Sequence, residues 1–594
     1  MARQHLSTFS HYSPRLRLGK LATLHYRPPS YLTFWIYSMI PIANRVVACR
    51  LCLILALIAA RPAFGADHVR DLQTDAIEHG YSAAVHWGWQ PKNYILWGSH
   101  SNRLIPIYTY GTKGAGSAID LDDYVGANSV YRNREYLEQL YGYLPDHTVS
   151  STAEYMDQTD VFRIQRAALE AGKKHIFLVV FDGMDWQTTR AASIHNLQRV
   201  AYTEGRGVGT HFQEYTASGT SQFGFMVTAP HNDGTDIDLD AQGVKNPGGT
   251  VRSGYDPERG GPNPWTPGAD PQYLVSEPKK ATDRHAYTDS SSSATSMTAG
   301  IKTYNNAITV DWQGKHVDTI AHIAQARGYQ VGVVSSVPIS HATPASAYAH
   351  NVDRTDYQDL TRDMLGLRSI SHPTEPLTGL DVVIGGGYGD IHEKSSGQGQ
   401  NFVPGNAYLT DADLAQVDVQ NGGKYLVVQR ADGVRGNEAL AHAAAQAAQL
   451  GKRLLGFYGV GTAKGHVPFQ TADGDFHPVP GRAKKAEKYT EADIIENPTV
   501  AEMTAAALTF LQTSEKSFWL LVEPGDVDWA NHDNNLDNSI GAVNSGDAAV
   551  KVITDWVEQH SNWEESVLIV TADHGHYLFL DRPELLIAAP AATQ

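Results

Sequence analysis

Continuous apolar runs alternate with segments of helical periodicity through most of the chain. The clearest runs are Lys174–Phe181, Tyr329–Ser335, Asp381–Ile384, Arg453–Val460, Phe518–Val522 and Ser566–Thr571. Such runs are typical of strands that are buried on both faces of a sheet. The segments Val317–Arg327, Glu438–Leu450, Thr499–Thr513 and Ala542–His560 predict helices, the third opened by a capping box of Thr499 and Glu502. The alternation predicts an α/β fold, a three-layer αβα sandwich around a central, mostly parallel sheet.

A stretch of small residues predicts one further, short helix. Ser290–Ala299 contains serine, alanine and threonine almost throughout, Asp289 precedes it, and Gly300 is a typical helix terminator. Ser290 would stand at the helix N-terminus, where free backbone N–H groups and the helix dipole favour an anion. The Ser290 hydroxyl could therefore be a nucleophile that receives a phosphoryl group. Alternatively, Asp289 and Ser290 only cap a closely packed helix.

The chain divides into three predicted regions. Residues 1–65 form an upstream extension with a signal peptide, and residues 66–172 form an aromatic-rich accessory region that packs against the main domain. Residues 173–594 form that main domain, with loop insertions at 227–280 and 388–432.

The N-terminal region has the features of a secretory signal. Arg45 and Arg50 precede the apolar run Leu51–Ala60, and Ala63–Gly65 offers a small-residue cleavage site. Because the run is too short for a membrane span, we expect a periplasmic or secreted protein without a stable span after signal removal. A retained amphiphilic anchor is the alternative.

Two details refine this expectation. Met39 as the true start would give a signal of ordinary length. Both cysteines, Cys49 and Cys52, lie in the segment that would be removed, so the mature chain would carry no disulfide.

The charge balance bears on the partner. The chain has a formal net charge of −17, although residues 1–65 carry eight Lys or Arg and no acid, so the remainder is more acidic still. No basic face is evident, which argues against nucleic acid as a specific partner. An acidic protein that handles phosphate needs local positive charge, from metal ions or from a placed arginine.

Acids and histidines follow three of the apolar runs directly. They are Asp182 after the first run, Glu523, Asp528 and His532 after the fifth, and Asp573, His574 and His576 after the last. The carboxyl ends of parallel strands meet at one edge of a sheet, so we expect these side chains to converge. Buried charge is costly unless metal ions neutralise it. Mixed Asp and His ligands suit Zn²⁺, and an all-oxygen set suits Mg²⁺.

In this order the motifs resemble those of the alkaline phosphatases. The resemblance extends over roughly Lys174 to Leu580 and is carried by Asp182-Gly-Met, Thr288-Asp-Ser290 with the downstream Thr-Ala-Gly-Ile-Lys-Thr-Tyr-Asn305, His341-Ala-Thr343-Pro-Ala, Arg354, Glu523 with Asp528 and His532, and Ala572-Asp-His-Gly-His576. It implies that residues 173–594 are a catalytic domain. The implied activity is metal-dependent hydrolysis of small phosphate monoesters through a phosphoserine intermediate, releasing inorganic phosphate and an alcohol.

The resemblance also implies residue roles. Ser290 would be the nucleophile, and Arg354, oriented by Asp289, would bind two phosphate oxygens. Two Zn²⁺ and one Mg²⁺ are implied: the first zinc held by Asp182, Asp573 and His574, the second by Asp528 and His532, and the Mg²⁺ by Glu523, Thr343, Asp182 and His341. Trp529 and His576 would join Arg354 at the substrate. The family is often dimeric, which implies a possible homodimer.

Three departures from the family pattern stand out. His341 replaces an Asp of the best-known bacterial members, and Trp529 replaces a Lys, a combination that occurs in some marine bacterial members. The family usually takes the third ligand of the second zinc from a His-Thr-Gly-like segment well after the Asp-His pair. Here His576 is the only histidine between His574 and Gln594, so we expect either that the chain is cut short or that another histidine substitutes. His466, which follows the run Arg453–Val460, is the best substitute, and His477 is the next, although either could be an ordinary loop histidine.

Two other functions are compatible with the sequence. One is a phosphodiesterase or sulfatase of the same superfamily. Arg354 suits the dianionic end of a monoester, however, and the sulfatase Cys/Ser-x-Pro-x-Arg signature is absent around Ser290. The other is a non-catalytic metal- or phosphate-binding protein, if the second zinc site is incomplete.

Overall fold

The computed structural model of the chain describes residues 68–275, 285–395, 397–514 and 516–588. The predicted signal peptide, Met39 and both cysteines lie outside these residues. Phe64–Gln594 form one unit by their internal contacts. Among the described residues, no helix combines the length and the apolar character that a membrane crossing requires.

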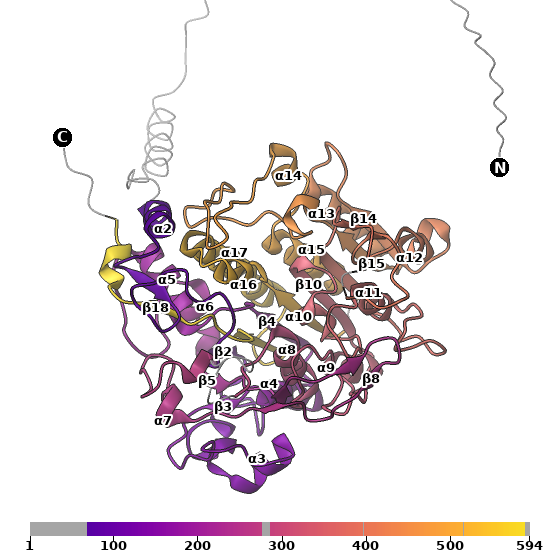
Figure 1. Cartoon of the computed structure of the whole chain (residues 1–594). Coiled ribbons are helices and arrows are strands. Elements are labelled where there is room, and N and C mark those ends of the chain that lie inside the picture. The colour runs from indigo at the N-terminus through magenta and orange to yellow at the C-terminus, as the bar shows by residue number, and fades with distance from the viewer. Residues whose placement is uncertain (1–67, 276–284, 396, 515, 589–594) are drawn as a thin grey trace, which may run out of the picture. The chain divides into compact units, whose positions relative to one another are not determined.

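A ten-stranded sheet runs through this unit in the order β14-β15-β11-β10-β16-β4-β17-β2-β5-β3 (Figure 1). In that order the strands are Tyr425–Gln429, Arg453–Phe457, Val382–Gly386, Gln330–Pro338, Phe518–Glu523, His175–Val180, Ser566–Thr571, Ile105–Tyr110, Gln222–Val227 and Met156–Asp157. The strands from β14 to β17 all pair in parallel, whereas β2 pairs antiparallel with both β17 and β5. The predicted mostly parallel sheet is therefore confirmed, and all six predicted apolar runs are strands in it.

Two groups of helices cover the sheet. One contains α5 (Trp186–Leu197), α13 (Gly436–Leu450), α15 (Val500–Gln512) and α17 (Leu536–His560), and the other contains α4 (Thr159–Glu170), α8 (Ser290–Ala299), α9 (Ile320–Ala326) and α10 (Ala342–Ala345). Both groups contact the central strands β10 and β16, which are thereby covered on two sides (Figure 1). This cover explains why every residue of β16 and β17 is buried and why their sequences are apolar. The three-layer α/β prediction is confirmed.

The predicted start of α15 is confirmed, and a capping residue marks it. The predicted start of α9 at Val317 is wrong, because Thr319 caps a helix that begins at Ile320. Thr499 and Glu502 form the predicted capping box of α15, with reciprocal side-chain and backbone hydrogen bonds. The prediction is wrong for α17, which begins at Leu536 and not at Ala542. Asn535 caps that helix by accepting a hydrogen bond from the N–H of Asn538. The polar residues of this first turn are themselves buried, so they interrupt the apolar periodicity from which the start was predicted.

The predicted accessory region and insertions contribute to the same unit. Strands β2 and β3 come from residues 66–172, and α2 (His68–His79) of that region contacts α17. The stretch 388–432 includes the edge strand β14 together with α12 (Asp411–Val417). The described part of 227–280 contains the short strands β6 (Asn232–Asp233), β7 (Ile237–Asp238), β8 (Gly243–Val244) and β9 (Val251–Arg252), which pair in two small sheets.

The antiparallel direction of β2 brings the segment before it to the edge where the parallel strands end. Ile107 pairs with Thr571, the last residue of β17, and Ser101 forms a bridge with Gly575. Residues just ahead of β2 therefore lie beside the residues that follow β17.

Candidate active site

Ser290 lies at the N-terminus of α8, as the sequence predicts. The helix spans Ser290–Ala299, Asp289 caps it by accepting from the N–H of Ser292 at 3.0 Å, and Gly300 ends it with a φ of 71°. The Ser290 Oγ atom lies 3.2 Å from Nε2 of His574 and 3.4 Å from Oδ1 of Asp182. The hydroxyl thus faces groups that follow β4 and β17.

Arg354 is held beside this helix end by Asp289. Its Nη1 donates to Oδ2 of Asp289 at 3.0 Å, and the same oxygen accepts from the Ser291 hydroxyl at 2.8 Å and from the N–H of Asn306 at 3.1 Å. Burial raises the pKa of Asp289, but the charge of Arg354 and the hydrogen bonds from Ser292 and Ser291 lower it below its ordinary value. A carboxylate that stays ionised keeps the guanidinium in place next to Ser290.

Asp182, Asp573 and His574 form the first group that could hold a metal ion. Nε2 of His574 lies 3.3 Å from Oδ1 of Asp182 and 3.4 Å from Oδ2 of Asp573, and all three side chains are fully buried. Burial and neighbouring carboxylates raise the pKa of Asp182 and of Asp573 well above the ordinary value. The two acids follow neighbouring parallel strands, so the fold itself forces them together, and a bound cation would offset their repulsion.

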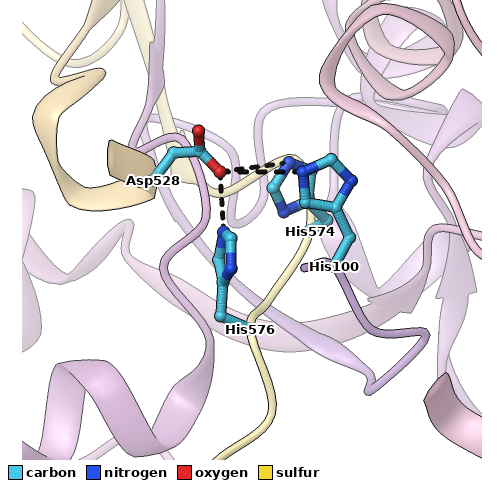
Figure 2. A group of neighbouring side chains, drawn as sticks. All are labelled: His100, Asp528, His574 and His576. Atoms are coloured by element: carbon cyan, nitrogen blue, oxygen red, sulfur yellow. Dashed lines mark hydrogen bonds and ion pairs between the residues drawn. The ribbon is translucent and has the colours of Figure 1, made fainter. Parts of the chain in front are cut away.

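A second group contains His100, Asp528, His574 and His576 (Figure 2). Oδ1 of Asp528 lies 2.6 Å from Nε2 of His576 and 3.8 Å from Nε2 of both His100 and His574. Helix α16 (Asp526–His532) places His532 one turn after Asp528, with Nε2 3.4 Å from the same oxygen and 3.2 Å from Nε2 of His100. Figure 2 shows the His100 and His574 rings side by side, facing this carboxylate.

The outer ring nitrogens of His100 and His532 are fixed by backbone carbonyls. Nδ1 of His100 lies 3.0 Å from the carbonyl oxygen of Thr288, and Nδ1 of His532 lies 2.8 Å from that of Gly98. Burial and the charges of neighbouring histidines hold the pKa of His100 well below its ordinary value, so its ring is neutral. A neutral ring that donates its other N–H to a carbonyl is the usual arrangement of a metal-ligating histidine.

Asp182, His341 and Glu523 form a third group. His341 precedes α10, on which Thr343 lies, and the Ser335 hydroxyl donates to Glu523. Burial raises the pKa of Glu523 to about 8 and lowers that of His341 to about 3. Among the described residues, Oδ2 of Asp182, Oε1 of Glu523, Nδ1 of His341 and Oγ1 of Thr343 are buried without a hydrogen-bond partner. Buried polar atoms are nearly always satisfied, so this set of oxygen and nitrogen atoms fits metal ions.

An open cavity of about 1610 Å³ gives access to these groups. Its lining includes Ser290, Arg354, His100, His341, Asp528, Trp529 and His532. His576 is not part of that lining, although its ring contacts Asp528. The ring centroid of Trp529 lies 5.9 Å from that of His341, and Nζ of Lys464 lies 5.6 Å from the Trp529 centroid. Lys464 therefore supplies positive charge near Trp529, the position at which the family resemblance implies a lysine.

The two histidines that the sequence favours as an extra zinc ligand lie elsewhere. His466 is fully buried, with Nε2 2.9 Å from Oε2 of Glu487 and Nδ1 2.7 Å from the carbonyl oxygen of Val467, so both nitrogens are engaged. His477 is exposed, with Nδ1 3.8 Å from Asp475. Neither belongs to a group of described residues that could hold a metal ion.

His100 is the site residue that sequence reasoning missed. The sequence signal that could have indicated His100 is the apolar run Ile105–Tyr110, which follows His100 closely. This run predicts a strand near an edge of the sheet, where Pro106 would be tolerated. Only an antiparallel strand brings the residue before it to the carboxyl edge of the parallel strands, and strand direction is not encoded in a local pattern.

The site lies at the carboxyl edge of a mostly parallel sheet, where carboxylates and imidazoles gather beside a helix N-terminus and a buried arginine. These groups define an α/β protein that could bind metal ions and an anion at one place. The family model described as alkaline phosphatase matches residues 250–584. The chain belongs to the alkaline phosphatase family.

Individual relatives share part of their length with this chain. The alkaline phosphatase of Escherichia coli (strain K12) is 31% identical over 333 residues, which cover 54% of this chain and 65% of that protein. Alkaline phosphatase 3 of Bacillus subtilis (strain 168) is 27% identical over 313 residues, which cover 52% and 54%. The chain thus spans about half to two thirds of these relatives. A solved alkaline phosphatase from the Antarctic bacterium TAB5 is 20% identical and covers 68% of this chain and 80% of that chain, with a TM-score of 0.39.

Proposed function

We propose that this chain hydrolyses phosphate monoesters at Ser290, through a phosphoserine intermediate. The observation that supports this most is the position of the Ser290 hydroxyl. It lies at a helix N-terminus, within 3.4 Å of Asp182 and His574, and it lines the same cavity as Arg354. Membership of the alkaline phosphatase family supports the same activity.

Arg354 and the start of α8 bind the phosphoryl group. Asp289 occupies one side of the guanidinium, which leaves other N–H groups of Arg354 free to donate to two phosphate oxygens. The helix N-terminus adds partial positive charge at Ser290. A monoester presents a dianionic end that uses both features, whereas a diester presents one charge fewer.

The proposed metal ligands are drawn from the three groups described above, with His532 and Thr343 added. Asp182, Asp573 and His574 would hold one Zn²⁺, and His100 and Asp528 with the neighbouring His532 would hold the second. Asp182, Glu523 and His341 with Thr343 would form the Mg²⁺ site. When bound, these cations neutralise the buried carboxylates, lower the pKa of nearby hydroxyl groups and act as Lewis acids toward phosphate oxygens. His576 positions Asp528 through the 2.6 Å contact to its Oδ1.

His100 replaces His466 in this assignment. Its Nε2 points to Asp528 and His532 while its Nδ1 bonds the Thr288 carbonyl, two residues before Ser290. His466 is already engaged by Glu487. His100 thus takes the place that the family usually gives to a histidine downstream of the Asp-His pair.

The Ser290 oxygen loses its proton and attacks phosphorus as the bond to the alcohol oxygen breaks, and the leaving oxygen gains a proton to become the alcohol. Water then hydrolyses the phosphoserine, which releases inorganic phosphate and restores the Ser290 hydroxyl.

Residues 173–594 would be the catalytic domain and 66–172 an accessory region that supplies His100. The signal-like sequence within residues 1–65 supports export to the periplasm or outside the cell. A homodimer would agree with the dimers that are common in the family.

Three esters of p-nitrophenol test this function on the full chain: p-nitrophenyl phosphate, the diester bis(p-nitrophenyl) phosphate, and p-nitrophenyl sulfate. We expect hydrolysis of the monoester, loss of it on chelation, and a fall of at least about 10³-fold for Ser290→Ala. Ser296→Ala is the matched control, because Ser296 lies on the same helix and its hydroxyl bonds only to the Ser292 carbonyl among the described residues. Retained turnover in Ser290→Ala contradicts the nucleophile, and faster diester or sulfate hydrolysis contradicts the substrate class.

A further inference from the structure

A second cluster of histidines shares no residue with the groups around Ser290. It contains His316, His350 and His372, with one ring nitrogen of each within 4.8 Å of the others. The ring centroids are 4.6 Å apart for His316 and His350, 5.0 Å for His316 and His372, and 5.2 Å for His350 and His372. Each histidine comes from a different loop: before α9, after α10, and after α11 (Tyr357–Leu365).

His350 is oriented as a ligand would be. Its side chain is buried, and its Nε2 lies 3.1 Å from the carbonyl oxygen of Val317. Nε2 therefore carries the proton, and Nδ1 carries the lone pair. That Nδ1 atom is buried and has no hydrogen-bond partner among the described residues. A buried nitrogen that faces other imidazoles without a donor is costly unless something binds it.

Asp363 fixes two of the three histidines. Its Oδ1 lies 2.9 Å from Nδ1 of His372, and its Oδ2 accepts from the backbone N–H of His350 at 3.0 Å. The carboxylate is itself fully buried, and the Ser369 hydroxyl donates to it. The contact to Nδ1 leaves Nε2 of His372 for a ligand role, and a carboxylate behind a histidine is the usual support of a metal ligand.

Burial disfavours the protonated form of His350 and of His316. Burial lowers the pKa of His350 well below its ordinary value, and the neighbouring His322 and His316 lower it further. Burial and His372 likewise lower the pKa of His316. Neutral imidazole is the form that binds a metal ion.

We propose that His316, His350 and His372 bind a Zn²⁺ ion, with water as the fourth ligand. Three imidazole nitrogens with an open fourth position suit tetrahedral zinc. A Zn–N length of about 2 Å brings such nitrogens to about 3.3 Å from each other. The exposed His316 ring can rotate to close that gap, while His350 and His372 are already held.

The ion would join three loops, one of which leads to the phosphate-binding arginine. The loop from His350 continues through Asn351, whose side chain donates to Asp356 at 2.8 Å, and passes Arg354 on the way. Arg354 is also held by its backbone N–H, which donates to the carbonyl oxygen of Asn306 at 2.8 Å. The zinc would therefore connect these loops, and it would share no ligand with the groups around Ser290.

Zinc counting on the full, untagged chain tests the proposal. Protein stripped with a chelator is reloaded with Zn²⁺, desalted and measured by mass spectrometry for zinc per chain. We expect His316→Asn and His372→Asn each to hold one zinc fewer than the wild type. His442→Asn is the control and should keep the wild-type count, because His442 is an exposed histidine of α13 without a neighbouring histidine cluster among the described residues.

Equal zinc counts in the wild type and both cluster variants would overturn the proposal, and so would an equal loss in His442→Asn. Replacement of zinc by Co²⁺ gives a second readout, since a tetrahedral Co²⁺ site absorbs visible light and the cluster variants should lose one such site. Because the count does not involve turnover, it holds whether or not Ser290 proves to be the nucleophile.

Discussion

Removal of the His100 imidazole should empty the second zinc site. In His100→Ala, Asp528 and His532 remain as protein ligands, and the nitrogen that lies 3.8 Å from Asp528 and 3.2 Å from His532 is gone. Loss of a group that merely orients a ligand weakens metal binding about 10–100-fold. Loss of the ligand itself should exceed the upper end of that range, which corresponds to more than about 2.7 kcal/mol.

Competition with a chromophoric chelator measures the zinc affinity of this variant. We expect one zinc per chain to weaken by more than about 100-fold in His100→Ala, with phosphate-ester turnover falling in parallel. His466→Gln is the comparison, because it removes the other candidate histidine and should leave zinc binding unchanged. Full zinc affinity in His100→Ala, together with loss in His466→Gln, would refute the assignment of His100.

Three further variants test other parts of the structure. Arg354→Lys replaces a planar fork by a point charge, so the inhibition constant of inorganic phosphate should rise about 10–100-fold in competition assays, whereas an unchanged constant would remove Arg354 from the phosphate site. His466→Gln should lower the free energy of urea unfolding by about 1–2 kcal/mol at pH 6, a value discounted because the Glu487 side chain is 34% exposed. Burial lowers the pKa of His466, but Glu487 raises it above its ordinary value of 6.5. The ion pair therefore stabilises the folded state fully below pH 6.5. The difference in unfolding free energy between wild type and variant should vanish as the pH rises through the raised pKa. A difference that grows toward pH 9 would contradict this sign. Gly300→Ala should cost about 2 kcal/mol or more, because φ is +71° and the new Cβ would lie 2.4 Å from Phe162, and an unchanged urea midpoint would contradict that strain.

The elements that the sequence predicts well are those with local signals. Helix α8 begins and ends as predicted because an Asp cap and a terminal Gly mark it. The parallel strands follow from uninterrupted apolar runs, which a sheet covered on both faces requires. The convergence of Asp182, Glu523 and Asp573 follows from the same topology, because each ends or follows a parallel strand at one edge.

What the sequence does not predict depends on pairings between distant segments. The position of His100 requires β2 to pair antiparallel with β17, more than 450 residues later in the chain, and no local pattern specifies this. His466 does follow a parallel strand, but β15 lies three positions from β16 in the sheet, or about 14 Å along its edge. The sequence predicted that His466 lies at the carboxyl edge of the sheet, but it did not predict how far along that edge His466 lies from β16.

The start of α17 was predicted wrongly for a related reason. Asp537, Asn538 and Ser539 are buried, so apolar periodicity cannot mark that turn. Asp537 accepts from the N–H of Ala472, which belongs to a distant loop. Burial of polar side chains by tertiary hydrogen bonds is visible only once the chain is folded.

The phosphoserine itself is the most direct test of the account. The full chain, loaded with Zn²⁺ and Mg²⁺, is mixed with a phosphate monoester, quenched in acid, digested and mapped by mass spectrometry. We predict phosphate on Ser290 and on no other serine of α8, and no phosphopeptide from Ser290→Ala. Phosphate on another residue, or continued turnover with no phosphorylated serine, would contradict the account.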